Sequence, residues 1–371
     1  MLRGLCSHRA GWLRAAALLL LPVLPGLAQA QVTPAAGYTP PDDTPAVKVG
    51  GVLFLDFTQT QDPKITDADG NRVSASAFNV GRAYLNVTGQ VNHLFAFRIT
   101  PDIVRETGTG SSLNGSLTYR LKYGYGQFNL DDWLWRGTYV RFGMIQTPYT
   151  DFEETVYRYR FQGTIFADRE GFASSADYGV SFRTAFPQNY GEVVAGLYNG
   201  DTYTRADPNN QKSFRMRATV RPFPGPGLAR GLRVTAYVDQ DHTVKEADRD
   251  RFIASALYEH KYVNTYFSYL KTKDQASIKN PAIDANGWSF WITPKTTVGV
   301  EGLFRYDRLN PNDANDSRKS RWIAGIAYWP KMAVTTVNTA FLLDFEQVKY
   351  EDFAPARPTE NRIAVHTLVT F

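Results

Sequence analysis

The sequence predicts an all-β transmembrane protein, an antiparallel β-barrel of about 16 strands with long outer loops and short periplasmic turns. Three observations support this prediction. Apolar and polar side chains alternate with a period of two, and the gaps between the alternating stretches are in turn long and short. Aromatic residues make up 14% of the chain, with 21 Tyr and 23 Phe. After the N-terminal leader, no apolar run is long enough to cross a membrane as a helix.

The first 30 residues have the features of a secretory signal peptide. Three Arg precede an apolar core at 15–24, and the triplet Ala-Gln-Ala at 28–30 resembles a cleavage site. The core is too short for a transmembrane anchor, and Pro22 and Pro25 interrupt it. The remaining 341 residues contain no cysteine, because Cys6 lies in the leader. They hold 38 Lys and Arg against 36 Asp and Glu, a net charge of +2. This balance excludes a general nucleic-acid binder.

The next segment, residues 31–46, contains four Pro among small and acidic side chains and is typical of an extended tether. We therefore expect residues 1–30 as the signal peptide, 31–46 as a Pro-rich periplasmic tether and 47–371 as an outer-membrane β-barrel. Export through the leader and insertion as a barrel predict an integral protein of the outer membrane, in contact with its lipid.

The alternation is clear in residues 214–221, where four apolar side chains alternate with Arg215, Arg217, Thr219 and Arg221. The last segment, 362–371, alternates in the same way and ends at Phe371. Sixteen such strands are expected to begin near Val47, Phe78, Leu94, Ser116, Thr138, Asp177, Gly191, Ser213, Gly231, Arg251, Tyr262, Gly287, Thr296, Ser320, Thr335 and Arg362.

The gaps between the predicted strands separate into two kinds. Odd-numbered strands are followed by eight long polar gaps, and even-numbered strands by seven short turns. The long gaps are 59–77, 102–115, 148–176, 201–212, 240–250, 273–286, 307–319 and 349–361. This asymmetry is typical of outer-membrane barrels, whereas a soluble β-sandwich has no reason to place its long loops at one end.

The aromatic surplus fits the same architecture, because amphipathic rings gather at the two membrane–water boundaries. Eight aromatic residues near predicted strand ends are expected in or near the lipid-facing phase. They are Tyr139, Tyr258, Tyr262, Phe267, Trp322, Tyr328, Phe345 and Phe371.

If the apolar phase of each strand faces lipid, the polar phase lines the channel, because Arg at the lipid midplane costs about 2–4 kcal/mol. The expected inward cations are Lys48, Arg82, Arg98, Arg120, Lys122, Arg141, Arg183, Arg215, Arg217, Arg221, Arg233, Arg251, Arg305, Arg321 and Arg362. The expected inward acids are Asp56, Glu192, Asp239, Glu259, Glu301, Asp344 and Glu346.

Two interpretations of this lining remain open. The cations lower the energy of anions in the pore and offer forked donors to carboxylate or phosphate, or they pair with wall and loop acids into a nearly neutral lining. The strand with Arg215, Arg217 and Arg221 is the best local candidate for a basic track.

The third long gap, 148–176, is twice the typical length and rich in aromatic and charged residues. Its apolar groups need burial, so we expect it to fold inward and constrict the channel. An outer lid or a subunit-contact flap is the alternative. The candidate constriction residues are Glu153, Glu154, Arg158, Arg160 and Arg169.

Catalytic and metal signals are weak. The segment 67–71 (Asp-Ala-Asp-Gly-Asn) contains fragments of a calcium loop without its terminal Glu, and a plain Asx/Gly turn is the preferred interpretation. The histidines show no zinc spacing, and His93 and His366 have no evident acid partner in the sequence. We therefore expect no catalytic residue, no metal and no cofactor.

Together these segments resemble the phosphate-selective porin O/P family of Gram-negative outer membranes. The likeness depends mainly on residues 140–149 (Val-Arg-Phe-Gly-Met-Ile-Gln-Thr-Pro-Tyr) followed by Glu153-Glu154, with support from 81–85, 177–180, 198–201 and 217–223. The resemblance implies a sixteen-stranded barrel, usually trimeric, that passes small solutes, with phosphate or polyphosphate selectivity in the best-known members. Lys is sparse in the outer loops here, so a general or mildly anion-preferring pore is the closer expectation.

The leading hypothesis is therefore a passive-diffusion porin for small hydrophilic solutes with an Arg-lined lumen. The alternative is a selective channel for sugars or organic acids, in which an aromatic constriction with Tyr157 and Tyr159 selects the solute. An outer-membrane enzyme and an adhesin are less favoured. The expected partners are permeant solutes, two further copies in a homotrimer, and the barrel-assembly machinery through the C-terminal strand ending in Phe371, with no nucleic acid.

Overall fold

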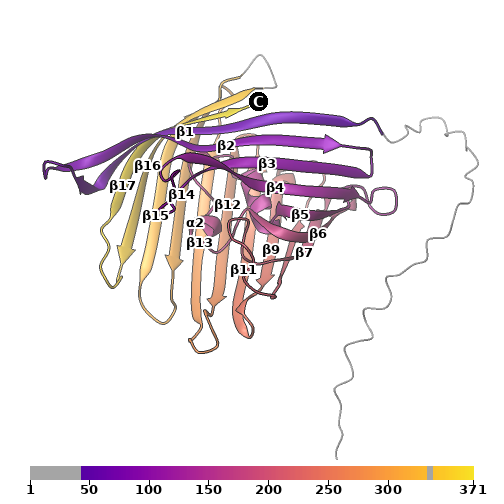
Figure 1. The fold of residues 1–371 in the computed structure, drawn as a ribbon. Coiled ribbons are helices and arrows are strands. Elements are labelled where there is room, and N and C mark those ends of the chain that lie inside the picture. Colours follow the sequence, from indigo (N-terminus) through magenta and orange to yellow (C-terminus); the bar gives the residue numbers. More distant parts are fainter. Residues whose placement is uncertain (1–42, 332–336) are drawn as a thin grey trace, which may run out of the picture. The chain divides into compact units, whose positions relative to one another are not determined.

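The computed structural model describes residues 43–331 and 337–371, which form one closed antiparallel sheet. In these ranges sixteen long strands follow in chain order, and β1 pairs with both β2 and β17, so that the sheet closes into a barrel (Figure 1). The first nine are β1 (Ala46–Thr66), β2 (Arg72–Gln90), β3 (Phe95–Arg105), β4 (Leu117–Asn129), β5 (Tyr139–Gln146), β6 (Ala176–Phe186), β7 (Gly191–Tyr198), β8 (Ser213–Val220) and β9 (Leu232–Gln240). The other seven are β11 (Ala247–His260), β12 (Val263–Asp274), β13 (Ile283–Pro294), β14 (Val300–Asn310), β15 (Arg318–Tyr328), β16 (Asn338–Glu351) and β17 (Glu360–Thr370).

The predicted fold class is confirmed, and every predicted strand overlaps one strand of the barrel. A short additional strand, β10 (His242–Val244), pairs with β11 within a long loop. The predicted signal peptide, residues 31–42 of the tether and the expected strand start at Thr335 lie outside the described residues.

The first long gap differs from its prediction. Instead of a loop over 59–77, β1 continues to Thr66 and β2 begins at Arg72, so the two strands form an extended hairpin. Asp67 closes its tip, because the carboxylate accepts hydrogen bonds from the backbone N–H groups of Asp69 (3.0 Å) and Asn71 (2.8 Å). The Asx turn preferred over a calcium loop is confirmed.

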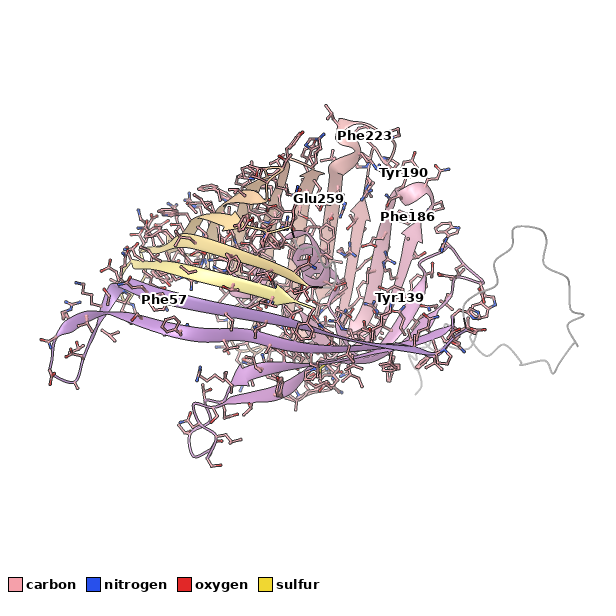
Figure 2. All side chains as sticks on the ribbon, turned by 90° about the horizontal axis from the view of Figure 1, so that it is seen from above. Phe57, Tyr139, Phe186, Tyr190, Phe223 and Glu259 are labelled. Atoms are coloured by element: carbon pink, nitrogen blue, oxygen red, sulfur yellow. The ribbon has the colours of Figure 1, made fainter. Side chains whose placement is uncertain are left out.

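Adjacent side chains on a strand point to opposite faces of the barrel. On β14, Phe304 is 42% exposed on the outer face, whereas its neighbour Arg305 is 1% exposed inside. Several strand cations, such as Arg215, Arg217 and Arg305, are thus buried inside the barrel, and most of the outer surface is apolar. Tyr139 departs from the predicted outer girdle: its ring lies 4.4 Å from the guanidinium carbon of Arg141, on the inner face (Figure 2 labels Tyr139).

Two β-bulges, one in β2 and one in β4, change the alternation of inward and outward side chains near the cations of these strands. The register of β1 with β2 skips Gly81, and that of β3 with β4 skips Lys122. A bulge inserts one residue and rotates the side chains beyond it. As a result, Lys122 and Tyr123 are both buried although they are neighbours in sequence. A regular strand would direct one of them to the outer face.

The described helices are short: α1 (Pro148–Val156), α2 (Phe166–Arg169), η1 (Pro187–Asn189) and η2 (Leu228–Gly231). The turns around η1 and η2 are neighbours, since the N–H of Arg221 donates to the carbonyl of Tyr190, and Phe186, Tyr190 and Phe223 surround this end of β6–β9 (Figure 2). In the ranges that the structure describes, none of the helices has the length and apolar character needed to cross a membrane.

Candidate functional site

The segment 147–175, which contains α1 and α2, lies inside the barrel against its inner wall. We call it the inner loop. Pro148 occupies the first turn of α1, and Tyr149, Phe152 and Val156 form one buried face with helical spacing. The Tyr149 hydroxyl lies 3.0 Å from that of Tyr266 on β12. This apolar face therefore attaches the beginning of the inner loop to the wall.

The rest of the inner loop packs against strands further along the chain. The ring of Tyr157 lies 5.4 Å from Trp291 on β13, and Phe161 contacts His366 on β17 edge-on. Arg305 on β14 donates to the carbonyl of Thr164 at 2.8 Å (α2 appears among the strands in Figure 1). The inner loop is thus held by the β9–β17 half of the wall.

Ion pairs reinforce this attachment. Arg158 pairs with Glu301 at 2.8 Å, and the Tyr159 hydroxyl donates to the same carboxylate at 2.8 Å. Arg169 pairs with Glu346 at 3.4 Å. Two candidate constriction residues, Arg158 and Arg169, therefore hold the loop on the wall.

The remaining loop candidates have other positions. Glu154 pairs with Arg160 at 2.8 Å within the loop. Glu153 is buried beside Tyr149, and burial raises the pKa of its carboxyl to about 7. Asp151 is the exposed acid of α1 and points to the open side of the lumen. Asp151 was not among the predicted constriction residues, because no helix was predicted in this segment.

Tyr157 and Tyr159 are 1% and 0% exposed. Tyr159 packs against Trp329 at a ring distance of 5.9 Å. Both tyrosines therefore face the wall and not the open lumen. They do not form the aromatic constriction that was the alternative expectation.

The open space lies on the opposite side of α1. Two cavities, of about 280 and 430 Å³, lie between α1 and the strands β5–β9 with the turns that join them. They share lining residues and are therefore adjacent. The shared residues are Asp151, Thr155, Arg183, Glu192 and Arg217. This space is the candidate permeation path.

The cations of β6–β9 are paired with acids. Arg215 contacts Asp177 and Asp239, both at 3.0 Å. Arg217 and Arg183 share Glu192. The basic track expected on β8 is therefore neutralised at Arg215 and Arg217.

Two further candidates lie near the short turns. Arg233 pairs with Glu259. Arg221, just beyond β8, lines the larger cavity and has no ion pair among the described residues. It is the only member of the expected β8 track that keeps an unpaired charge within those ranges.

Strands β2–β5 have a different charge balance. They contain one acid, Asp102, and seven cations: Arg72, Arg82, Arg98, Arg105, Arg120, Lys122 and Arg141. Asp102 pairs with Arg82 at 3.0 Å. We call the inner face of these strands the cationic wall.

Four cations of this wall have no ion pair within residues 43–331 and 337–371: Arg98, Arg120, Lys122 and Arg141. Tyrosine rings and neutral groups contact them instead. Arg98 lies over Tyr123 at 4.6 Å, and Lys122 over Tyr84 at 4.7 Å. Such contacts orient a cation without cancelling its charge.

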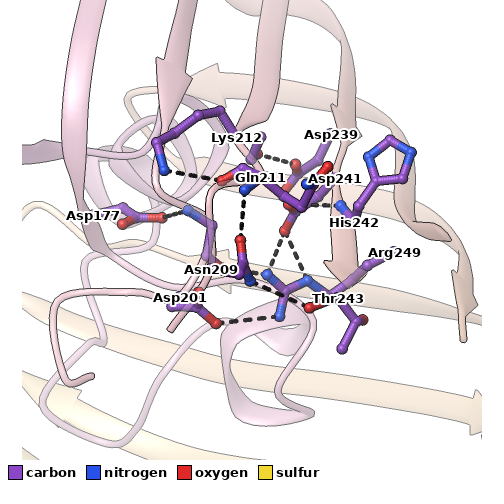
Figure 3. A network of polar contacts seen from close by, with 12 residues as sticks. Asp177, Asp201, Asn209, Gln211, Lys212, Asp239, Asp241, His242, Thr243 and Arg249 are labelled. Carbon is purple, nitrogen blue, oxygen red and sulfur yellow. Dashed lines mark hydrogen bonds and ion pairs between the residues drawn. The ribbon is translucent and has the colours of Figure 1, made fainter. Parts of the chain in front are cut away.

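The long loops beside the path are linked by ion pairs of their own. Arg249 on β11 pairs with Asp241 at 2.5 Å and with Asp201 at 3.8 Å, between the loops that follow β7 and β9 (Figure 3). Lys212 pairs with Asp207 at 2.7 Å. These contacts hold the loop end of β7–β11 together.

Three described histidines have acid partners that the sequence did not reveal: His93, His366 and His242, the last at 3.6 Å from Asp248. His93, in the turn before β3, contacts Asp43 and Asp132, and these bonds raise the pKa of its imidazole. His366 lies 3.2 Å from Asp344 inside the barrel. In the described parts of the chain, no group of three His, Cys, Asp or Glu side chains could hold a metal ion.

A closed barrel of sixteen strands with a long loop folded into its lumen is the fold of outer-membrane porins. No known family model and no curated protein matches the sequence. Solved structures of outer-membrane porins and channels do match the fold.

Three of these structures cover nearly the whole barrel. An anion-selective porin from Comamonas acidovorans has a TM-score of 0.61 and 14% identity, covering 88% of this chain and 100% of its own. OmpT of Vibrio cholerae, in a structure described as its trimer form, has a TM-score of 0.57 and 13% identity, covering 89% and 100%. The outer membrane channel DcaP of Acinetobacter baumannii has a TM-score of 0.56 and 11% identity, covering 88% and 97%. At these identities the likeness shows the fold.

Proposed function

We propose that the protein is an outer-membrane porin for passive diffusion of small hydrophilic solutes, with a mild preference for small anions such as phosphate. The cationic wall is the observation that carries this proposal: four of its cations have no ion pair among the described residues. Of these four, Arg141 lines the smaller cavity beside α1, and an unpaired positive charge there lowers the energy of a passing anion. Paired cations such as Arg215 contribute little to that field.

In this proposal the inner loop is the element that makes the channel selective. Since it occupies the β9–β17 half of the lumen, solutes pass between α1 and the facing wall. Asp151 then lies on one side of the path and Arg141 on the other, both lining the smaller cavity. A solute between them experiences a transverse field, which favours small polar ions and disfavours apolar molecules.

The assembly proposed is a homotrimer in the outer membrane. It is supported by the fold and by the trimer form described for the Vibrio protein. The leader would direct export, and the C-terminal strand ending in Phe371 would be recognised by the barrel-assembly machinery.

The experiment is a single-channel reversal potential in a planar bilayer under a KCl gradient, with and without phosphate. Reversal toward the chloride potential, with phosphate reducing the current, supports the anion preference. Reversal toward the potassium potential rejects it and leaves a general or sugar-type channel. Folded protein without any conductance would reject the porin proposal itself.

A further inference from the structure

The outer face of β14–β16 bears three exposed cations where the strands approach the long loops: Arg318, which faces the acid Glu351, and Arg308 and Lys349, which face no acid. In the register, Arg308 on β14 faces Ser320 on β15, and Ser320 faces Lys349 on β16. Arg308 and Lys349 are exposed. Adjacent strands lie about 4.8 Å apart, so the two long side chains, roughly 10 Å apart at Cα, can converge over the serine hydroxyl.

These two cations are available for a ligand. In the described part of the chain neither side chain has an ion-pair or hydrogen-bond partner. The nearby outward acid, Glu351, faces Arg318 in the register and not Lys349. On β5–β9, by contrast, all strand cations belong to the inner face: Arg141, Arg183, Arg215, Arg217 and Arg233. Outward strand cations therefore distinguish this sector from β5–β9, although Lys271 on β12 is also exposed on the outer face.

Aromatic side chains lie directly below the cations on the same face. Tyr306 and Trp322 are register partners, and the Trp322 ring lies 4.9 Å from Phe345. The Trp322 indole N–H donates to Gln347 at 3.0 Å. Such a row is typical of the boundary between lipid headgroups and acyl chains, so the cations above it lie at headgroup level.

An apolar groove of about 560 Å³ lies below the aromatic row. It exists because Gly302 and Ala324 are small residues between bulky neighbours, including Phe304, Ile326 and Phe345. Phe304 and Arg308 are four residues apart on one strand, which corresponds to about 13 Å. That separation matches the step from a headgroup phosphate to the upper part of an acyl chain.

We infer that this face binds one phosphate-bearing lipid of the outer leaflet. Its phosphate lies between Arg308 and Lys349 over the Ser320 hydroxyl, and an acyl chain fills the groove beside Ala324. Charge complementarity above and an apolar groove below, centred on β14–β16 and bordered by β13 and β17, together select an anionic lipid. The inference rests on the membrane location of the barrel and is independent of which solute crosses the lumen.

The test measures lipid binding to the full mature chain in dodecyl maltoside by native mass spectrometry. The probes are lipid A with two phosphates and phosphatidylcholine. The wild-type protein is expected to retain lipid A in preference to phosphatidylcholine. The double variant Arg308→Gln/Lys349→Gln should lose at least tenfold in lipid A affinity, and Ala324→Leu should lose a similar factor because leucine fills the groove.

Lys64→Gln is the matched control, since it removes one exposed positive charge at the tip of the β1–β2 hairpin, away from the groove. Equal lipid A affinity in the double variant and in Lys64→Gln overturns the inference. Displacement of lipid A by millimolar inorganic phosphate overturns it too, since the cations would then be a free-phosphate site. Unchanged heat-modifiable migration in gels shows that each variant is folded, and an unchanged reversal potential separates this result from the porin proposal.

Discussion

The ring of Phe371 lies directly over Gly51 on β1, so that a Cβ added to Gly51 would come within 2.3 Å of the ring's Cζ atom. The two residues also exchange backbone hydrogen bonds of 2.8 and 3.1 Å, at the seam where the last strand meets the first. Because Gly51 has no side chain, the Phe371 ring can pack against β1 at this seam.

Substitution Gly51→Val should displace that ring and lower the free energy of unfolding by about 1–3 kcal/mol, the usual cost of overpacking. Urea unfolding followed by tryptophan fluorescence measures the change. Gly225→Val is the matched control, because nothing lies within 4 Å of a Cβ at that turn position. Equal losses in both variants would show that the seam has no special packing.

Glu346 is the acid on which several lumen groups converge. Arg321, Arg362 and Arg169 all pair with it, and it is 3% exposed. Glu346→Gln should destabilise the barrel by about 2–3 kcal/mol, since three partly buried guanidinium groups lose a charge-assisted partner. Glu246→Gln, at an exposed loop position, should change stability by less than about 0.5 kcal/mol. Thermal unfolding in detergent compares the two, and a Glu346 variant as stable as the control contradicts the prediction.

Arg141 and Arg215 should respond differently to the same substitution. Arg141→Gln removes a cation without an ion pair in the described ranges, so anion preference should fall while stability changes little. Arg215→Gln leaves Asp177 and Asp239 without their partner, so stability should fall by about 3–5 kcal/mol. Reversal potentials and thermal unfolding of both variants provide the check. The proposed role of the cationic wall fails if Arg141→Gln leaves the reversal potential unchanged.

Glu153 predicts a pH dependence of stability. Its folded pKa of about 7 exceeds its ordinary value of 4.5, so between these pH values the folded protein retains a proton that the unfolded chain has released. The contribution of this group to stability therefore falls as pH rises from 4.5 to 7, by about 3 kcal/mol in total. Glu153→Gln, which does not titrate, should remove that part of the slope when unfolding is measured between pH 4.5 and 8. If the stability of the wild-type protein and of Glu153→Gln changed with pH in parallel, the raised pKa of Glu153 would be refuted.

The sequence predicted the strands well because side-chain alternation is a local property. It placed Arg215 and Arg217 on the inner face, where they lie. Their partners Asp177 and Glu192 belong to other strands, and which carboxylate meets which guanidinium depends on the stagger of the strands. Stagger is set by the whole barrel, so the neutralisation of β8 could not be derived from one strand.

The extended hairpin was missed for a different reason. Residues 59–62 (Gln-Thr-Gln-Asp) are polar on both faces and precede Pro63, which is a loop signal. The strands continue there because their backbone groups pair with each other, with no apolar face required. The inner loop is a third case: its length and its aromatic content predicted that it folds inward, but many inward strand faces could have received it.

The lumen is divided between a half that holds the inner loop and a half that borders the open space. Because the loop contacts β9–β17, substitutions on the cationic wall leave its attachment intact. Under the proposed function, the cations that favour anions and the strands that anchor the inner loop therefore lie in different parts of the barrel. Such a barrel can evolve toward a new permeant by single changes on β3–β5, without first acquiring compensating changes elsewhere.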